Sequence, residues 1–418
     1  MARRRSPLAT PSRRLTFPSV DRPEISATTE FPCAQCGADL RFSPGEAVLR
    51  CDYCGHRNHI DIEHQPIQEL DFRTAVEKQL HEAQIETTIV AKCSSCGAEV
   101  EFDANVHSDD CPFCSGPLVT DTMQHRHIRP RALLPFAVTE RQGKEALRRW
   151  LGSRWFAPSA LKRYARADER LNGIYTPYWT FDAETESEYA GQRGDIYYVQ
   201  RWVTVMTDQG PKRQLQTVPK VRWTSVRGRV RRAFDDVLVL GARSLPKAIT
   251  DRLAPWDLHA LVPYQQQFLA GFRAEAYTVD LREGFAEGRG IMDLTIARDV
   301  RLDIGGDHQR ISNVDTHFGD VTFKHVLLPV WIAAYRFRGK VYRFVVNGRS
   351  GEVQGERPYS WWKIALAVIA GLIVAGALFF FLEGSGALRG GGGGGPGYVV
   401  PYDPPRQLPP LRLPDGFR

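Results

Sequence analysis

The chain has 418 residues, of which 43% are hydrophobic and 25% are charged, and its formal net charge is +7. This length allows two or three domains, and the hydrophobic fraction is ample for a packed core, which excludes a protein that is disordered throughout. The first 30 residues are rich in arginine and lack an apolar segment. We therefore expect residues 1–30 to form a basic, disordered arm and not a secretory signal peptide.

All eight cysteines lie between Cys33 and Cys114, in two copies of one pattern. In each copy fourteen residues separate two CxxC pairs, and the second copy follows the first by sixty residues. A CxxC turn presents two sulfur atoms, and Zn²⁺ prefers four thiolates in a tetrahedron. The pattern predicts two zinc ribbons, residues 31–60 and 91–120, each closed around one structural zinc ion. The eight predicted ligands are Cys33, Cys36, Cys51, Cys54, Cys93, Cys96, Cys111 and Cys114.

Disulfides, redox-active cysteine pairs and iron are the alternatives to structural zinc. Disulfides need an oxidising compartment, and thioredoxin-like pairs need a βαβ context that this segment lacks. Iron fits the same spacing as zinc. Glycine follows three of the four CxxC pairs, which favours tight turns with positive φ, and alternating apolar residues over 38–42 and 98–102 predict a strand in each unit. Because a closed site with four cysteines has no open coordination position, the metal units indicate recognition and not catalysis.

Helical segments are predicted on both sides of the second metal unit. The segment before it has apolar residues at helical spacing, at Ile67, Leu70, Phe72, Val76, Leu80 and Ile85. This spacing predicts a helical linker over residues 61–90. After the unit, Thr139 is the candidate N-cap of a helix that runs to Trp155 and is ended by Pro158. We therefore expect a helical connector over residues 121–170.

Residues 171–356 predict a mainly β, α+β domain. Short runs of Val, Ile, Tyr, Trp and Phe alternate there with Gly and Pro, as in strands separated by turns. Near its end, residues 327–337 and 341–346 predict a hairpin, followed by turns at residues 347–348 and 350–351.

A basic segment lies within this domain. Residues 193–232 contain ten Lys and Arg against two Asp. Side chains alternate between the faces of a strand. One face would then carry Trp223, Ser225, Arg227, Arg229 and Arg231. We expect Trp223, Arg227, Arg229 and Arg231 to form a candidate site for anions, either a nucleic-acid backbone or anionic lipid headgroups, and the alternative is a solvated, charged strand that prevents pairing with other sheets.

Residues 361–382 predict one transmembrane helix. Nineteen uncharged residues follow Lys363, close to the roughly 20 that span a bilayer. Basic residues are more numerous before the segment than after it, where only Arg389 lies within twenty residues. This asymmetry predicts that the N-terminal domains face the cytoplasm and the tail lies outside. The tail, residues 383–418, is rich in Gly and Pro and is expected to be disordered.

Four stretches of the chain resemble a bacterial protein family, namely residues 171–182, 234–240, 303–308 and 347–359. It is the family of zinc-ribbon proteins with one C-terminal transmembrane helix, often labelled "primosomal protein N′ (replication factor Y), superfamily II helicase" or "TFIIB-type zinc ribbon-containing protein". The resemblance spans residues 31–382 and implies a single-pass protein of the bacterial cytoplasmic membrane. A helicase of that superfamily needs a GxxxxGK[ST] loop to hold nucleotide phosphates, and this sequence contains none. ATP hydrolysis is therefore not expected.

A group of acidic residues and histidines is the best remaining catalytic candidate. It consists of Asp303, Asp307, His308, His317 and His325. Carboxylates and imidazoles can bind a metal or transfer protons, and Gly305 and Gly306 would let the backbone approach a ligand closely. However, neither HExxH nor a Ser-His-Asp arrangement frames them, and such residues are common in hydrogen-bonded turns. We therefore expect no enzymatic activity.

The sequence as a whole predicts two N-terminal zinc ribbons with helical linkers, a mainly β domain and one C-terminal transmembrane helix. The expected function is that of a non-enzymatic adaptor or scaffold that brings a protein partner to the membrane. One alternative is a nucleic-acid-binding protein at the membrane, associated with replication or transcription but without a helicase motor. The other is an enzyme that uses the region of Asp303, Asp307 and His308.

Overall fold

The computed structural model describes most of the chain between residues 31 and 384. The described ranges are 31–62, 66–77, 81, 84–101, 108–114, 116–119, 123–154, 171–207, 210–337, 340–356 and 361–384. The predicted basic arm, and the predicted tail from residue 385 onward, lie outside these ranges. The chain divides into two compact units, Met1–Pro358 and Tyr359–Arg418.

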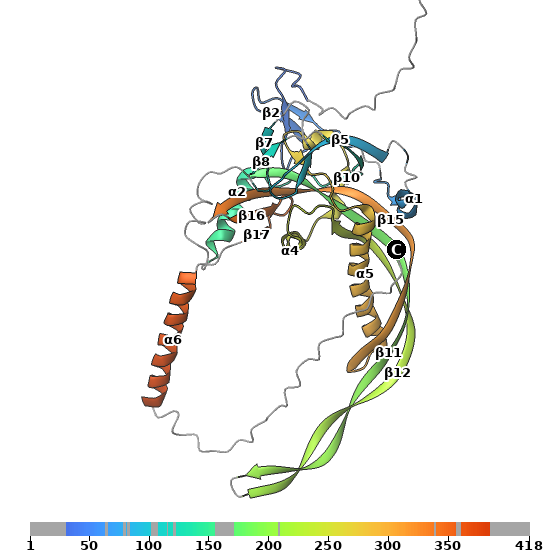
Figure 1. Cartoon of the computed structure of the whole chain (residues 1–418), viewed down its shortest axis with the longest axis vertical. Coiled ribbons are helices and arrows are strands. Elements are labelled where there is room, and N and C mark those ends of the chain that lie inside the picture. Colours follow the sequence, from blue (N-terminus) through green and yellow to red (C-terminus); the bar gives the residue numbers. More distant parts are fainter. Residues whose placement is uncertain are drawn as a thin grey trace, which may run out of the picture. The chain divides into compact units, whose positions relative to one another are not determined.

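The larger unit is built on a nine-stranded sheet, which confirms the mainly β domain. Strand β11 (Asn172–Thr207) pairs antiparallel with β12 (Gly210–Leu240) on one side and with β15 (His308–Phe337) on the other. The hydrogen-bonded order runs β12-β11-β15-β10-β13. The pairing of β15 ends at His308, opposite Gly194, so the rest of β11 and β12 continues as a two-stranded ribbon (Figure 1).

The other strands of this sheet are short. They are β4 (Leu70–Asp71), β10 (Ala132–Leu133), β13 (Val262–Pro263), β14 (Arg273–Ala274), β16 (Lys340–Asn347) and β17 (Val353–Gly355). The predicted C-terminal hairpin is confirmed, because β15 and β16 pair up to Phe337 opposite Lys340. Between β12 and β14 lie α4 (Lys247–Thr250), η2 (Asp251–Leu253), η3 (Leu258–Ala260) and η4 (Gln266–Leu269).

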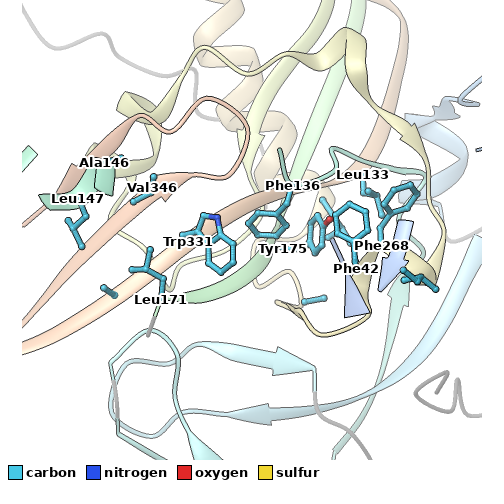
Figure 2. Packing of buried hydrophobic residues seen from close by; sticks show 14 of the residues in the cluster. Phe42, Leu133, Phe136, Ala146, Leu147, Leu171, Tyr175, Phe268, Trp331 and Val346 are labelled. Carbon is cyan, nitrogen blue, oxygen red and sulfur yellow. The ribbon is translucent and has the colours of Figure 1, made fainter. Parts of the chain in front are cut away.

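The first metal unit is a three-stranded antiparallel sheet. Its strands are β1 (Leu40–Phe42), β2 (Val48–Cys51) and β3 (Arg57–His59). Phe42 is buried against Phe268, with ring centroids 5.2 Å apart. Figure 2 shows these rings in a cluster that continues through Tyr175 and Phe136 to Trp331. The first metal unit therefore shares its hydrophobic core with the main sheet.

The helical linker predicted between the metal units is not evident. The described part of residues 61–90 contains strand β4, the five-residue helix α1 (Phe72–Val76) and the start of strand β5 (Ile85–Lys92). Five of the eight residues in β5 are Ile, Thr or Val, whose branched side chains fit a pleated strand better than a helix. The helical spacing of apolar residues was therefore a misleading signal here.

The second metal unit is inserted between two paired strands. β5 pairs antiparallel with β9 (Met123–Ile128), from Ile85 opposite Ile128 to Val90 opposite Met123. The insertion contains β6 (Glu99–Glu101), β7 (Ser108–Asp110) and β8 (Pro117–Val119). β6 pairs with β5, and β7 pairs with β8. The first part of the predicted helical connector is thus a strand.

Helix α2 (Glu140–Gly152) confirms the helix predicted after Thr139. The Thr139 N–H donates to Gln142 Oε1 at 2.8 Å and the Gln142 N–H donates to Thr139 Oγ1 at 3.3 Å, which is a capping box. Leu147 on its buried face packs in the same core cluster as Trp331. The predicted end of this helix at Trp155 and Pro158 lies outside the described residues.

Helix α5 (Leu281–Ile304) was not predicted, and it packs on the face formed by β11 and β12 (Figure 1). Apart from Leu281 in the first turn, its buried residues recur every four positions, at Gly284, Gly288, Met292, Ile296, Val300 and Ile304. Glycine occupies two positions of this row, so the sequence shows no continuous apolar stripe that would predict the helix. The two glycines are needed for close packing, because a Cβ on Gly284 would lie 2.8 Å from Trp179 Cδ1 and one on Gly288 would lie 3.0 Å from Phe181 Cδ2.

The smaller unit contains helix α6 (Trp361–Gly384). Among the helices of the described residues, its segment Trp362–Phe381 is the one long and apolar enough to cross a membrane. Its Leu, Ile, Val and Phe side chains are largely exposed. The helix is therefore compatible with the predicted single membrane span.

The packing of α5 makes opposite predictions for two glycines. Gly284→Ala is expected to lower the free energy of unfolding by about 1–3 kcal/mol, because the new methyl group collides with the buried Trp179 ring. Gly290→Ala is the matched control: it has no atom within 4 Å of its Cβ position, and alanine should stabilise the helix by about 0.5–1 kcal/mol. Denaturant unfolding of the detergent-solubilised full chain measures both. Equal effects of the two substitutions would contradict the close contact.

Candidate metal centres

Each group of four cysteines converges on one point, with all four Sγ atoms within 4.8 Å of one another. In the first site, Cys33 Sγ lies 3.6 Å from Cys54 Sγ, and Cys36 Sγ lies 3.5 Å from Cys51 Sγ. In a tetrahedral site with metal–sulfur bonds of about 2.3 Å, the sulfur atoms lie about 3.8 Å from one another. A disulfide bond would require a distance of about 2.05 Å between two sulfur atoms. The first site therefore has the dimensions of a metal site.

The second site repeats this geometry. Cys93 Sγ lies 3.5 Å from Cys114 Sγ, and Cys96 Sγ lies 3.7 Å from Cys111 Sγ. The described cysteines are all free of disulfides. The two groups can thus hold two metal ions, as the spacing of the sequence predicted.

The predicted tight turns explain how CxxC pairs present two sulfur atoms each. Gly37, Gly55 and Gly97 have φ of 75°, 75° and 76°, a conformation that is strained for residues with a Cβ. The Gly37 N–H donates to Cys33 O at 2.8 Å, and the Gly97 N–H donates to Cys93 O at 2.8 Å. These hydrogen bonds close each turn, so that its two sulfur atoms face the same metal position.

The two sites differ in exposure. Cys36 and Cys54 are exposed in the first site, whereas Cys96 is half-buried and its three partners are buried in the second. The second site packs in a cluster that includes Ile174 and Val330 of the main sheet. Both metal units thus pack into the hydrophobic core of the larger unit and are not independent domains joined by a linker.

The candidate anion-binding residues lie on one face of β12, but two of them have acidic partners. Cross-strand pairing places Glu186 of β11 opposite Arg231 and Glu188 opposite Arg229. Arg231 Nη2 lies 2.8 Å from Glu186 Oε1, and Arg229 Nη1 lies 2.9 Å from the same oxygen. Arg229 also pairs with Glu188. Anion binding by this face remains a prediction, with much of its positive charge balanced within the sheet.

Trp223 of the same set makes a cation–π contact with Arg310, whose guanidinium carbon is 3.9 Å from the Trp223 ring centroid. The opposite face of this part of β12 packs on α5. Val226 and Val230 pack there against the cluster of Ile296 and Val300 on α5. The two faces of this part of the strand therefore have separate roles, one in the core and one towards solvent.

The five candidate catalytic residues do not form one group. Asp303 Oδ2 accepts a hydrogen bond from the Tyr189 hydroxyl at 2.5 Å, and Asp307 Oδ2 accepts one from the Ile196 N–H at 2.7 Å. Asp303 thereby holds the end of α5 to strand β11, and Asp307 holds the turn after α5 to the same strand. His308 begins β15 and lies seventeen positions before His325, roughly 55 Å along a strand.

The two other histidines of this set also have different surroundings. His317 is exposed, opposite Glu186. His325 is buried, and its Nδ1 lies 2.7 Å from Ile128 O. Burial lowers the pKa of His325 to about 4, so it is neutral at physiological pH. The five residues are thus distributed over the end of α5, the turn after it and strand β15.

Sequence analysis missed an ion cluster around Lys324, whose side chain is 8% exposed. Lys324 Nζ lies 2.7 Å from Asp236 Oδ1, 3.0 Å from Glu69 Oε1 and 3.6 Å from Asp182 Oδ2. Burial raises the pKa of Asp182 to about 6. The carboxylates of three residues are close enough to bind one cation, namely Asp182, Asp235 and Asp236. The ammonium group of Lys324 is already the cation that pairs with Asp182 and Asp236.

This cluster coincides with an irregularity of the sheet. The register of β11 against β12 shifts between Phe181 and Ala183. Asp236 has φ of 53°, and its N–H donates to Asp182 Oδ1. The one sequence signal was the Asp235-Asp236 pair inside an apolar strand, and its partners are too distant in sequence to be recognised.

Native mass spectrometry of the full chain, released from detergent micelles, should show two bound metal ions. Cys96→Ser is expected to leave one, because a hydroxyl group replaces one of the four thiolates of the second site. Ser94→Ala changes an exposed residue of the same turn that is not a ligand, and it should keep both ions. Wild-type protein without metal, or a Cys96→Ser variant with two ions, would contradict the assignment.

Comparisons with known proteins add one relative. No protein-family model and no solved structure matches the chain. A similar protein from Bacillus subtilis (strain 168), "Uncharacterized protein YdjG", is 23% identical over 354 residues, which cover 84% of this chain and 96% of that protein. The similarity therefore extends well beyond the two metal units.

Proposed function

We propose that the chain is a membrane-anchored adaptor that binds a protein partner through its first metal unit. The observation that carries this proposal is the position of Tyr53, which lies between the ligands Cys51 and Cys54 and is 86% exposed. Exposed aromatic side chains are enriched where proteins bind one another. The core contact of Phe42 fixes the unit that presents Tyr53. A partner would therefore meet a rigid aromatic contact.

We propose zinc as the metal in both sites. Four thiolates at tetrahedral spacing form a closed site, and zinc commonly stabilises small units with little core of their own. Iron would accept the same ligands. The mass of the ions in the native spectrum distinguishes the two metals.

The adaptor is proposed to have no catalytic activity. Closed metal sites have no position for a substrate, and the candidate catalytic residues Asp303 and Asp307 are used in contacts between α5 and β11. Nucleic-acid binding is the second candidate, supported by the net charge of +7. The ion pairs of Arg229 and Arg231 with glutamates favour the adaptor over it.

The proposed topology places the larger unit in the bacterial cytoplasm and the tail outside, because basic residues are concentrated before α6. A cysteine introduced by Val399→Cys should react with a membrane-impermeant maleimide on intact cells, whereas one introduced by Leu294→Cys on α5 should react only after lysis. Both variants retain the metal-ligand cysteines, so wild-type labelling is subtracted. The reverse pattern would invert the topology.

The partner-binding role of Tyr53 is tested by site-specific photo-crosslinking in cells. A photoreactive amino acid at position 53 should give a discrete cross-linked protein, and one at Leu294, which is 76% exposed on α5, should not. Tyr53→Ala should reduce recovery of that protein at least tenfold, with two metal ions retained. The same products from both positions, or unchanged recovery with Tyr53→Ala, would exclude this surface as the binding site.

A further inference from the structure

The ribbon formed by residues 195–207 of β11 and 210–222 of β12, here called the β-arm, has no described strand or helix against either face. The strands pair continuously, from Asp195 opposite Arg222 to Thr207 opposite Gly210. Thirteen residues at roughly 3.3 Å each extend it by about 40 Å beyond the three-stranded part of the sheet (Figure 1). A two-stranded ribbon of this length is marginal in water without further contacts.

The two faces of the β-arm differ in chemistry. Directly opposed residues of an antiparallel pair share a face, so the register assigns each side chain. One face carries the apolar or aromatic residues Ile196, Tyr198, Trp202, Met206, Pro211, Leu215, Pro219 and Val221, with the polar residues Gln200, Thr204, Arg213 and Thr217 between them. Its large side chains are strongly exposed: Tyr198 is 70% exposed, Trp202 64% and Met206 80%. This is an apolar face with nothing in the described chain to cover it.

The β-arm is also cationic. Residues 195–222 contain five basic residues, Arg201, Lys212, Arg213, Lys220 and Arg222, against Asp195 and Asp208, which gives a net charge of +3. The register places Arg201, Lys212, Lys220 and Arg222 on the face opposite the apolar one. Arg222 lies over the Tyr197 ring on that face. Because the ribbon is only two strands wide, long side chains such as Arg201 and Lys220 can reach around its edges.

We propose that the apolar face of the β-arm binds the surface of a lipid bilayer that contains anionic lipids. Tyr and Trp favour the membrane interface, where Met206 and Leu215 would also leave water. The net positive charge complements anionic headgroups. A nucleic acid would instead require cations on the contacted face, and that face carries only Arg213.

The inference rests on the proposed membrane anchoring, which would hold every copy of the β-arm near a bilayer. Anchoring by α6 raises the local concentration of lipid surface, so that a weak contact suffices. The β-arm would then fix the orientation of the larger unit relative to the bilayer. This is a second membrane contact, independent of the span.

Lipid quenching of Trp202 tests the proposal on the full chain. The protein is reconstituted, one copy per disc, into nanodiscs of phosphatidylcholine with or without phosphatidylglycerol, using brominated or ordinary acyl chains. The emission difference between wild type and Trp202→Phe isolates Trp202 from the other tryptophans. Brominated lipid should reduce this difference at least twofold in anionic discs and less in neutral discs. Replacing Lys212, Lys220 and Arg222 by Ser should remove the effect of the anionic lipid.

A matched control uses Leu294→Trp in the Trp202→Phe background, which places an exposed tryptophan on α5. Its emission should not depend on bromination. Failure of the chain to enter discs would overturn the anchoring and this inference with it, whereas entry without quenching of Trp202 overturns this inference alone. Two results without lipid quenching would also overturn it: protection of Trp202 by DNA, or detergent dimers that Trp202→Ser dissociates.

Discussion

The hydrogen-bond ladder along β11 is the interaction on which the rest of the structure depends. This strand satisfies its backbone groups against β12 on one side and β15 on the other, and segments far apart in sequence meet on it. Helix α5 can approach it closely because glycines replace side chains over Trp179 and Phe181. Where the ladder is irregular, Lys324 balances the carboxylates that gather there. The sheet thus determines which side chains face the core and which face solvent.

The metal units depend on the same core. Phe42 of the first unit enters the aromatic cluster of Figure 2, and the second unit packs against Ile174 and Val330. Small Cys₄ units usually gain most of their folding free energy from the metal, on the order of 10 kcal/mol. Here apolar contacts with the sheet add to that stabilisation. Metal binding and the packing of the main domain are therefore coupled, which suits units that must present a surface rigidly.

Short motifs were read correctly from the sequence, whereas two periodic patterns and the contacts between distant residues were not. The CxxC spacing and the N-cap residue Thr139 are short motifs within the sequence, so the cysteine sites and α2 were predictable. At β5 the helical spacing of apolar residues outweighed β-branched composition in the prediction, and the strand was missed. Helix α5 was missed because its core-facing row includes glycine, a poor helix former. The partners of Lys324 are brought near it only by the sheet.

The insertion of the second metal unit has a consequence for how such chains can vary. The unit begins after Val90 and returns at Met123, and these two positions are opposite each other in one strand pair. The chain therefore enters and leaves the unit at neighbouring positions. Residues can be inserted or deleted in the loops of the unit without shifting the register of the strands in the main sheet. The first unit has no such joint, since its chain leads directly into β4 and α1. The second unit thus joins the chain at one place while its core still packs on the main sheet, whereas the first lies in line with the chain that leads into β4.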